Sequence, residues 1–273
     1  LRRLVPAATH TTVTTVGYVR SARRSFAVIL AVTLVAVACS SDGDEPAPVA
    51  AGDQAPAGSG ATLDIGPGRT DLVVELADDT SISVTILAPV DWTPGMPTPV
   101  LLALPPGDQN QSMVDAGISR YWESGPERGW VVVSPASSGE NFIRGGARQL
   151  APLLDALAGT VVAESGRVHV AGPSNGGLSA FRFALDHPDT VRSVVGLPGY
   201  PPGADESIEP LVDIPVALYV GETDVGWRAP MERFAADLAD LGGSVDITVS
   251  AGEGHVLENI NPDELFDVLD AAR

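Results

Sequence analysis

The sequence predicts an α/β fold, with a mostly parallel central sheet, helices on both of its faces and no large cap domain. Short apolar runs alternate with stretches of helical periodicity along most of the 273 residues, and this order of elements builds a parallel sheet. One apolar run, residues 167–172, leads through a glycine-rich turn directly into a helical pattern. Polar residues follow the ends of later apolar runs, at the edge where a parallel sheet collects its functional groups.

The first half of the domain begins with a pair of strands. Residues 71–77 and 81–88 alternate or run apolar around an Asp-Asp-Thr turn, which predicts that they pair antiparallel. The other elements expected in this half are buried strands at 99–104 and 129–134, a loose helix at 112–128, and a helix at 144–164, where Leu and Val recur at helical spacing.

The second half alternates more regularly. A helix is expected directly after the strand at 167–172, because Leu178, Phe181 and Leu185 recur at helical spacing. The other expected elements are strands at 191–197, 215–220 and 244–250, helices at 229–241 and 262–272, and a loop rich in Pro and Gly at 198–205. This alternation favours parallel strands that are joined by helices.

The most informative motif is Gly172-Pro-Ser-Asn-Gly-Gly177, which lies between the strand at 167–172 and the helix after it. Its small residues let a strand turn sharply into a helix and hold the serine in strained backbone geometry, with the hydroxyl pointing outward. This strand, turn and helix are typical of a nucleophile elbow, so we expect Ser174 to be the nucleophile of acyl transfer. A helix start capped by serine is the alternative.

The partners of such a nucleophile are expected on loops after later strands. Asp224 follows the strand at 215–220, and His255 follows the next strand along the chain. The other three histidines lie in the N-terminal segment, inside a strand and at a helix end. We expect His255 to accept the proton of Ser174, and Asp224 to orient the imidazole and stabilise its positive form. Glu222 is the alternative orienting carboxylate.

The elbow, Gly221-Glu-Thr-Asp224 and Gly252-Glu-Gly-His255 together resemble the α/β-hydrolase superfamily, over residues 65–273. Within it, the elbow is similar to that of the esterase and poly(3-hydroxybutyrate) depolymerase group, which includes feruloyl esterases and secreted lipoproteins. The resemblance implies the α/β-hydrolase fold and a serine esterase that cleaves small or polymeric carboxylic esters through an acyl-enzyme, with no cofactor. A prolyl-oligopeptidase-like peptidase would show similar motifs. So would a binding lipoprotein that keeps the hydrolase fold but no longer turns over substrate.

The resemblance also implies two main-chain N–H donors for the oxyanion of the tetrahedral intermediate. Asn175, which follows the nucleophile, supplies the first. The second should come from the loop at 104–109, where the superfamily commonly has a His-Gly pair and then a glutamine, and where this chain has two prolines. Because proline has no N–H, Gly107 is the expected donor, with Asp108 next. The carboxylate of Asp108 would disfavour anionic acyl groups.

The cleft is expected to be open. Only 50 residues separate Ser174 from Asp224, which leaves room for two strands and a loop but not for a large helical cap. Tyr200 in the loop at 197–204, and Trp227 beside Asp224, are candidate walls for the substrate. Ordinary packing is the alternative for each.

Composition excludes several other classes of function. All 16 basic residues are arginine, and the absence of lysine excludes a Ser-Lys dyad, a Schiff base and a P-loop. From Cys39 onward the chain has 11 arginines and 35 acidic residues, a net charge of −24, which repels nucleic acid. One cysteine and four histidines without metal-ligand spacing predict neither an intrachain disulfide nor a metal site.

The N-terminal segment has the pattern of an export signal. Three arginines between residues 20 and 24 precede an apolar run of 13 residues that ends in Ala36-Val-Ala before Cys39. This resembles a bacterial lipoprotein signal peptide, with Ala36 where leucine is usual, and it is shorter than the roughly 20 residues of a membrane span. We therefore expect a signal peptide over 1–38, a flexible linker with a lipidated Cys39 over 39–61, and a catalytic domain over 62–273. That domain would be secreted, or held outside the cytoplasm at the cell membrane through the lipid alone.

Overall fold

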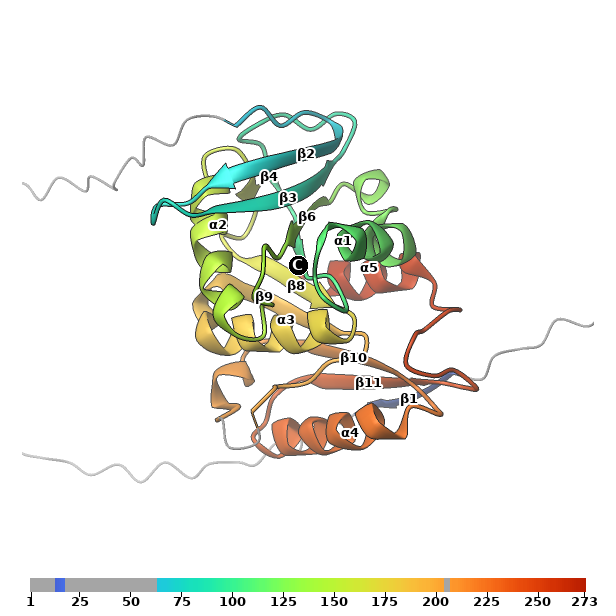
Figure 1. Ribbon diagram of the computed structural model, residues 1–273. Helices are drawn as coiled ribbons and strands as arrows, with labels where there is room; N and C mark the ends of the chain where they lie inside the picture. Colours follow the sequence, from blue (N-terminus) through green and yellow to red (C-terminus); the bar gives the residue numbers. More distant parts are fainter. Residues whose placement is uncertain (1–12, 18–62, 204–206) are drawn as a thin grey trace, which may run out of the picture. The chain divides into compact units, whose positions relative to one another are not determined.

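The fold is that of a computed structural model, which describes residues 13–17, 63–203 and 207–273. In the described part of the chain, nine strands form one sheet in the order β1-β11-β10-β9-β8-β5-β6-β3-β2 (Figure 1). The five pairs between β6 and β11 are parallel, whereas β3 and β2 at one end and β1 at the other pair antiparallel. The expected α/β class and mostly parallel sheet are confirmed.

Each strand expected from an apolar run is present, and its ends differ from the expected ones by at most three residues. The pair at 71–77 and 81–88 is antiparallel, as expected. The strands of the sheet are β1 Val13–Gly17, β2 Gly68–Glu75, β3 Ser81–Ala88, β5 Val100–Ala103, β6 Val131–Ala136, β8 Val168–Gly172, β9 Val191–Gly196, β10 Val216–Gly221 and β11 Val245–Ser250, and a separate pair is formed by β4 Pro97–Thr98 and β7 Val162–Ala163.

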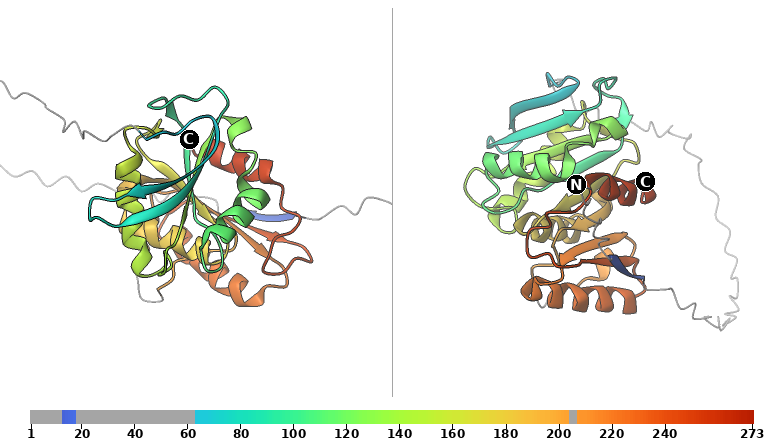
Figure 2. Two further views of the ribbon diagram at one scale, coloured as in Figure 1. Left: turned by 45° about the horizontal axis from the view of Figure 1, so that its top comes forward. Right: turned by 90° about the vertical axis from the view of Figure 1, so that its right-hand side faces the viewer.

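Helices cover both faces of the sheet (Figures 1 and 2). They are α1 Gln111–Gly117, α2 Leu150–Leu157, α3 Asn175–Asp186, α4 Val225–Asp240 and α5 Pro262–Ala271. The apolar residues of α1 and α5 belong to one core, and those of α2, α3 and α4 belong to the other. In β5, Leu101 lies in the first core and Leu102 in the second. Because central strands are buried on both faces, they are continuous apolar runs in the sequence.

Three helical expectations are corrected in their bounds. The loose helix at 112–128 is α1 followed by a π-helical stretch, Ile118–Trp122, and a 3-10 turn, Pro126–Arg128. The helix at 144–164 is a 3-10 turn followed by α2, which ends at Leu157, where the next residues turn into β7. Finally, α4 begins four residues earlier than expected, and Pro230 lies inside the helix without ending it.

The segment between β9 and β10 decides whether the domain has a cap. Its described residues form a loop and one 3-10 turn, Glu209–Leu211, so no large cap domain is present there.

None of the helices in the described ranges is long and apolar enough to cross a membrane. Cys39 and the linker lie outside the described residues, so the leader, the lipid and the domain bounds stay predictions. Val13–Gly17 pairs with β11, and removal of a leader over 1–38 would leave β11 at the edge of the sheet.

Candidate active site

Ser174 occupies the turn between β8 and α3. Its backbone is in a strained conformation for a residue other than glycine, with φ of 56° and ψ of −120°. Two main-chain hydrogen bonds hold it there: Ser174 N donates to Pro198 O at 2.9 Å, and Leu178 N donates to Ser174 O at 3.0 Å. The structure therefore places the serine on a sharp strand-to-helix turn, as the motif predicts.

The glycines of this turn allow three main-chain segments to meet. A Cβ atom at Gly172 would collide with the backbone of Gly176, and one at Gly176 would collide with the carbonyl of Leu104 at the end of β5. A Cβ atom at Gly177 would meet the carbonyl of Pro198. Since each obstacle is backbone rather than a movable side chain, larger residues would force the turn apart.

His255 and Asp224 lie beside the serine. The Nε2 atom of His255 is 2.8 Å from Ser174 Oγ, and its Nδ1 atom is 2.7 Å from Asp224 Oδ2. The three residues are far apart in sequence, but each lies in the segment that follows the carboxyl end of β8, β10 or β11. A carboxylate only accepts hydrogen bonds, so in the neutral imidazole Nδ1 is the donor to Asp224 and Nε2 is the acceptor from the serine hydroxyl.

The loops that carry Asp224 and His255 are bonded to each other. Thr223 donates from its N and its Oγ1 to the carbonyl of Glu253, at 2.9 and 2.8 Å. Glu222, the alternative orienting carboxylate, accepts from Gly252 N at 2.8 Å. Glu222 therefore fixes the backbone of the histidine loop, while Asp224 is the carboxylate that contacts the imidazole.

His169, the histidine inside β8, is buried and does not face the serine. Its Nδ1 atom is 2.7 Å from Ser193 Oγ, and its ring lies 4.8 Å from that of Trp130. Burial, followed by the charge of Arg192, lowers the pKa of His169 from 6.5 to about 4. It is therefore neutral at physiological pH and has a packing role.

The two expected oxyanion donors lie on adjoining segments. Asn175 is the first residue of α3, and its side-chain Nδ2 donates to Gly107 O at 2.8 Å. Gly107 has a φ of +56°. Within the described ranges, the main-chain N–H groups of Asn175 and Gly107 donate to no protein acceptor. Both N–H groups are thus available as donors.

Aromatic rings line one side of the histidine. The ring of Trp227 lies 5.0 Å from that of His255, at an interplanar angle of 45°. Tyr200 packs edge-on against Trp227, with 5.4 Å between ring centroids. The two candidate wall residues thus form one cluster with the histidine.

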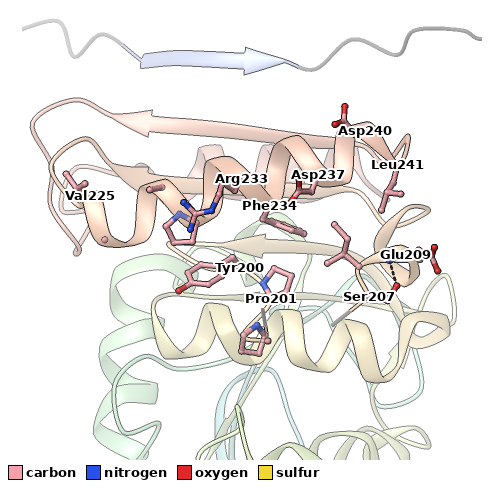
Figure 3. Close-up of a pocket in the computed structure, with 16 residues that line it drawn as sticks. Tyr200, Pro201, Ser207, Glu209, Val225, Arg233, Phe234, Asp237, Asp240 and Leu241 are labelled. Atoms are coloured by element: carbon pink, nitrogen blue, oxygen red, sulfur yellow. Dashed lines mark hydrogen bonds between the residues drawn. The ribbon is translucent and has the colours of Figure 1, made fainter. Parts of the chain in front are cut away.

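A groove of about 1090 Å³ follows α4, and of the aromatic cluster only Tyr200 lines it (Figure 3). Tyr200 and Val225 lie toward one end of the groove, and Glu209 and Leu241 lie toward the other. Apolar side chains such as Pro201 and Phe234 line its middle, together with charged residues. Its Tyr200 end is the one near the triad, because Val225 directly follows Asp224.

Comparisons with known proteins show which proteins this chain resembles. No protein-family model matches the chain. A curated protein named "Putative esterase NocK", from Nocardia uniformis subsp. tsuyamanensis, is 28% identical over 108 residues, which are 40% of this chain and 29% of that protein. Among solved structures, acetyl xylan esterase from Aspergillus awamori superposes with a TM-score of 0.60 at 14% identity, over 74% of this chain and 99% of that one. The chain has the α/β-hydrolase fold.

This chain covers only part of two further structures that share the fold. A thermostable esterase superposes with a TM-score of 0.58 at 16% identity, over 67% of this chain and 54% of that one. Dipeptidyl peptidase 4 from Porphyromonas gingivalis gives a TM-score of 0.58 at 15% identity, over 76% of this chain and 35% of that one. The shared fold therefore includes structures named as esterases and one named as a peptidase.

One residue beside this site, Gln109, was given no role from the sequence. It is fully buried and has a φ of 58°, which is uncommon for a residue other than glycine. The sequence shows that Gln109 ends the loop at 104–109, but it does not show that the residue is buried or that its φ is positive. The described residues hold no cluster of His, Cys, Asp or Glu that could bind a metal ion.

Proposed function

We propose that this α/β-hydrolase is a serine esterase that cleaves carboxylic esters through an acyl-enzyme on Ser174. The observation that carries the proposal is the continuous hydrogen-bonded chain from Ser174 through His255 to Asp224, starting from a serine in strained elbow geometry. Similarity to two structures and one curated protein that are named as esterases supports an ester rather than a peptide bond as the target.

Acylation follows from the positions of the three groups. His255 Nε2 removes the proton of Ser174 as Oγ attacks the ester carbonyl, and a new C–O bond forms. The carbonyl oxygen becomes an oxyanion, which the N–H groups of Asn175 and Gly107 stabilise. Collapse breaks the bond to the alcohol, and the imidazolium returns its proton to the leaving alkoxide. Asp224 stabilises the imidazolium during this step.

Deacylation repeats the sequence with water in place of the serine. His255 removes a proton from a water molecule that attacks the acyl-enzyme, and then returns the proton to Ser174 Oγ as the acid leaves. We assign the acyl or alcohol portion of the ester to the groove along α4, which Tyr200 lines. Trp227 lies between Tyr200 and His255, in ring contact with both, and would be the wall nearest the reacting bond. Its size accommodates small esters or part of a polymer chain.

Hydrolysis of p-nitrophenyl acetate, butyrate and octanoate by the purified protein tests the proposal. We expect turnover by the wild type and loss of it in Ser174→Ala, while Ser81→Ala, a change at an exposed serine on the far hairpin, keeps full activity. Cleavage of a peptide library without ester turnover would instead assign a serine peptidase. Well-folded protein that neither turns over esters nor reacts with an organophosphate would be a binding protein.

We also propose that the domain works outside the cytoplasm, tethered through a lipid on Cys39. The support is the sequence pattern alone: an arginine-flanked apolar run that ends in small residues before the single cysteine. The flexible composition of 40–61 would let a tethered domain stand away from the membrane surface.

A further inference from the structure

The loop between β5 and α1, residues 104–110, carries the expected oxyanion donor but has few hydrogen bonds of its own. Pro105 and Pro106 have no N–H groups. Two residues of the loop, Gly107 and Gln109, have positive φ, at 56° and 58°. Glycine adopts this conformation without strain, but glutamine does not. Its main chain donates to Pro106 O at 3.0 Å within the loop and accepts from Ser137 N at 2.7 Å, and contacts of its side chain add to these.

The side-chain amide of Gln109 makes three hydrogen bonds and is fully buried. Its Nε2 donates to Pro105 O at 3.1 Å and to Ser179 Oγ at 2.9 Å, while its Oε1 accepts from Phe142 N at 2.7 Å. Because Phe142 N can only donate, the orientation of the amide is fixed, with the oxygen toward Phe142 and the nitrogen toward the other two. One side chain thus joins its own loop, α3 and the loop after β6.

The hydrogen bonds continue from Gln109 to both oxyanion donors. Ser179 Oγ donates to Asn175 O at 2.8 Å, and Asn175 Nδ2 donates to Gly107 O at 2.8 Å. The network therefore runs from Gln109 through Ser179 to Asn175 and then to Gly107. The two residues with free N–H groups are its last two members.

We infer that Gln109 is a positioning residue for the oxyanion hole, acting through Ser179 and the Asn175 side chain to hold the N–H of Gly107 toward the reacting carbonyl. This rests on the proposed acyl transfer at Ser174. Gln109 touches neither the substrate nor the reacting atoms. Its loss therefore weakens stabilisation of the transition state rather than substrate binding, and it lowers kcat with little change in KM.

The first experiment compares Gln109→Met with Gln111→Ala, using p-nitrophenyl butyrate. Methionine keeps the length and volume of glutamine but removes its hydrogen bonds. Removal of one oxyanion donor costs about 10²- to 10³-fold in kcat, so misplacement of Gly107 should cost about 10- to 100-fold. Gln111 is the matched control: it lies two residues along the chain, and its amide bonds to Thr85 instead of to the network. Its substitution should leave kcat unchanged.

A double-mutant cycle separates positioning from general support of the fold. Asn175→Ala removes the side chain that holds Gly107 but keeps the main-chain N–H. If Gln109 acts through the Asn175 side chain, the second substitution should add little. The kcat of Gln109→Met/Asn175→Ala should then equal that of the single variant with the lower kcat, within about threefold. Losses that multiply, or a Gln109→Met enzyme with unchanged kcat, would overturn the inference. Should Gln109→Met fail to fold, Ser179→Ala breaks the same network and takes its place in the cycle.

The rate at which a fluorophosphonate labels Ser174 gives a readout that does not depend on the substrate class, because the phosphoryl oxygen occupies the same hole. If the wild type labels rapidly but hydrolyses no ester, the ester proposal fails while the labelling rates of the same variants still test the inference. A slower rate in Gln109→Met and an unchanged rate in Gln111→Ala would support it. If the wild type neither turns over esters nor is labelled, both the proposed function and the inference about Gln109 are overturned.

Discussion

Two acidic residues, Glu222 and Asp224, lie in the three positions after β10. Their hydrogen bonds indicate different roles. Asp224 contacts His255, whereas Glu222 contacts the main chain at Gly252. We expect Asp224→Asn to lower kcat by about 10³- to 10⁴-fold, because the amide no longer holds the productive tautomer. Glu222→Gln should lower it by less than about threefold, since the residue is exposed and the amide oxygen still accepts from Gly252. Steady-state ester hydrolysis measures both, and equal losses would contradict this assignment.

His169 predicts a pH dependence of stability that is independent of catalysis. Burial lowers its pKa to about 4 in the folded protein, below the value of about 6.5 in an unfolded chain. The unfolded state therefore binds the proton more readily, so this contribution is fully present above pH 6.5 and is lost as the pH falls toward 4.

The size of the effect is at most about 3 kcal/mol, from a shift of roughly two and a half pKa units. Denaturant unfolding between pH 7 and pH 4 should show a shallower decline for His169→Gln than for the wild type. His187→Gln, a change at a partly exposed histidine, serves as the control. Identical slopes for His169→Gln and the wild type would refute the role given to burial.

At the scale of single residues, the sequence predicts the positions of Ser174, Asp224 and His255, because the order of strands already determines which loops share an edge. It does not predict the role of Gln109. That role depends on a positive φ and on partners 33 and 70 residues away in the chain, which no local pattern encodes.

At the scale of elements, the elbow depends strictly on small residues. A Cβ atom at Gly176 would collide with the carbonyls of Leu104 and Pro105. We therefore expect Gly176→Ala to lower the free energy of unfolding by about 2–4 kcal/mol and to reduce activity, because the turn must open.

The matched variant is Gly159→Ala, where a Cβ atom would meet nothing within 4 Å and φ is not positive. Its free energy of unfolding should remain within about 0.5 kcal/mol of the wild type. Thermal or urea unfolding of the two variants measures the difference. Equal stability of the two would show that the backbone contacts at the elbow are not restrictive.

The bounds of the central strands were predictable, because burial alone determines them. The central strands are apolar on both faces, so each run in the sequence shows where a strand lies. The stretch at 112–128 was less predictable. Its π-helical stretch buries Tyr121 and Trp122, and the ring of Trp122 packs edge-on against Phe266 of α5. Such a stretch depends on packing with a distant helix rather than on local periodicity.

For the whole molecule, the alternation of strands and helices was sufficient to predict the α/β class, whereas the attachment of the domain stays a prediction. In a bacterial host that processes lipoproteins, we expect the full chain in the membrane fraction and Cys39→Ser in a soluble fraction, because the thiol is the site of lipid addition. Ser40→Ala should behave as the wild type. Retention of Cys39→Ser in the membrane fraction would argue against a lipid anchor.

The decisive measurement is the identification of the covalent intermediate. The protein is mixed with p-nitrophenyl acetate, quenched in acid, cleaved after arginine and analysed by mass spectrometry, with fragmentation of the peptide at 168–182 because it contains both Ser174 and Ser179. We predict an acetyl group on Ser174, and none in His255→Ala. Ester turnover without an adduct at Ser174, or with acetylation elsewhere that matches the rate of turnover, would contradict acyl transfer at the elbow.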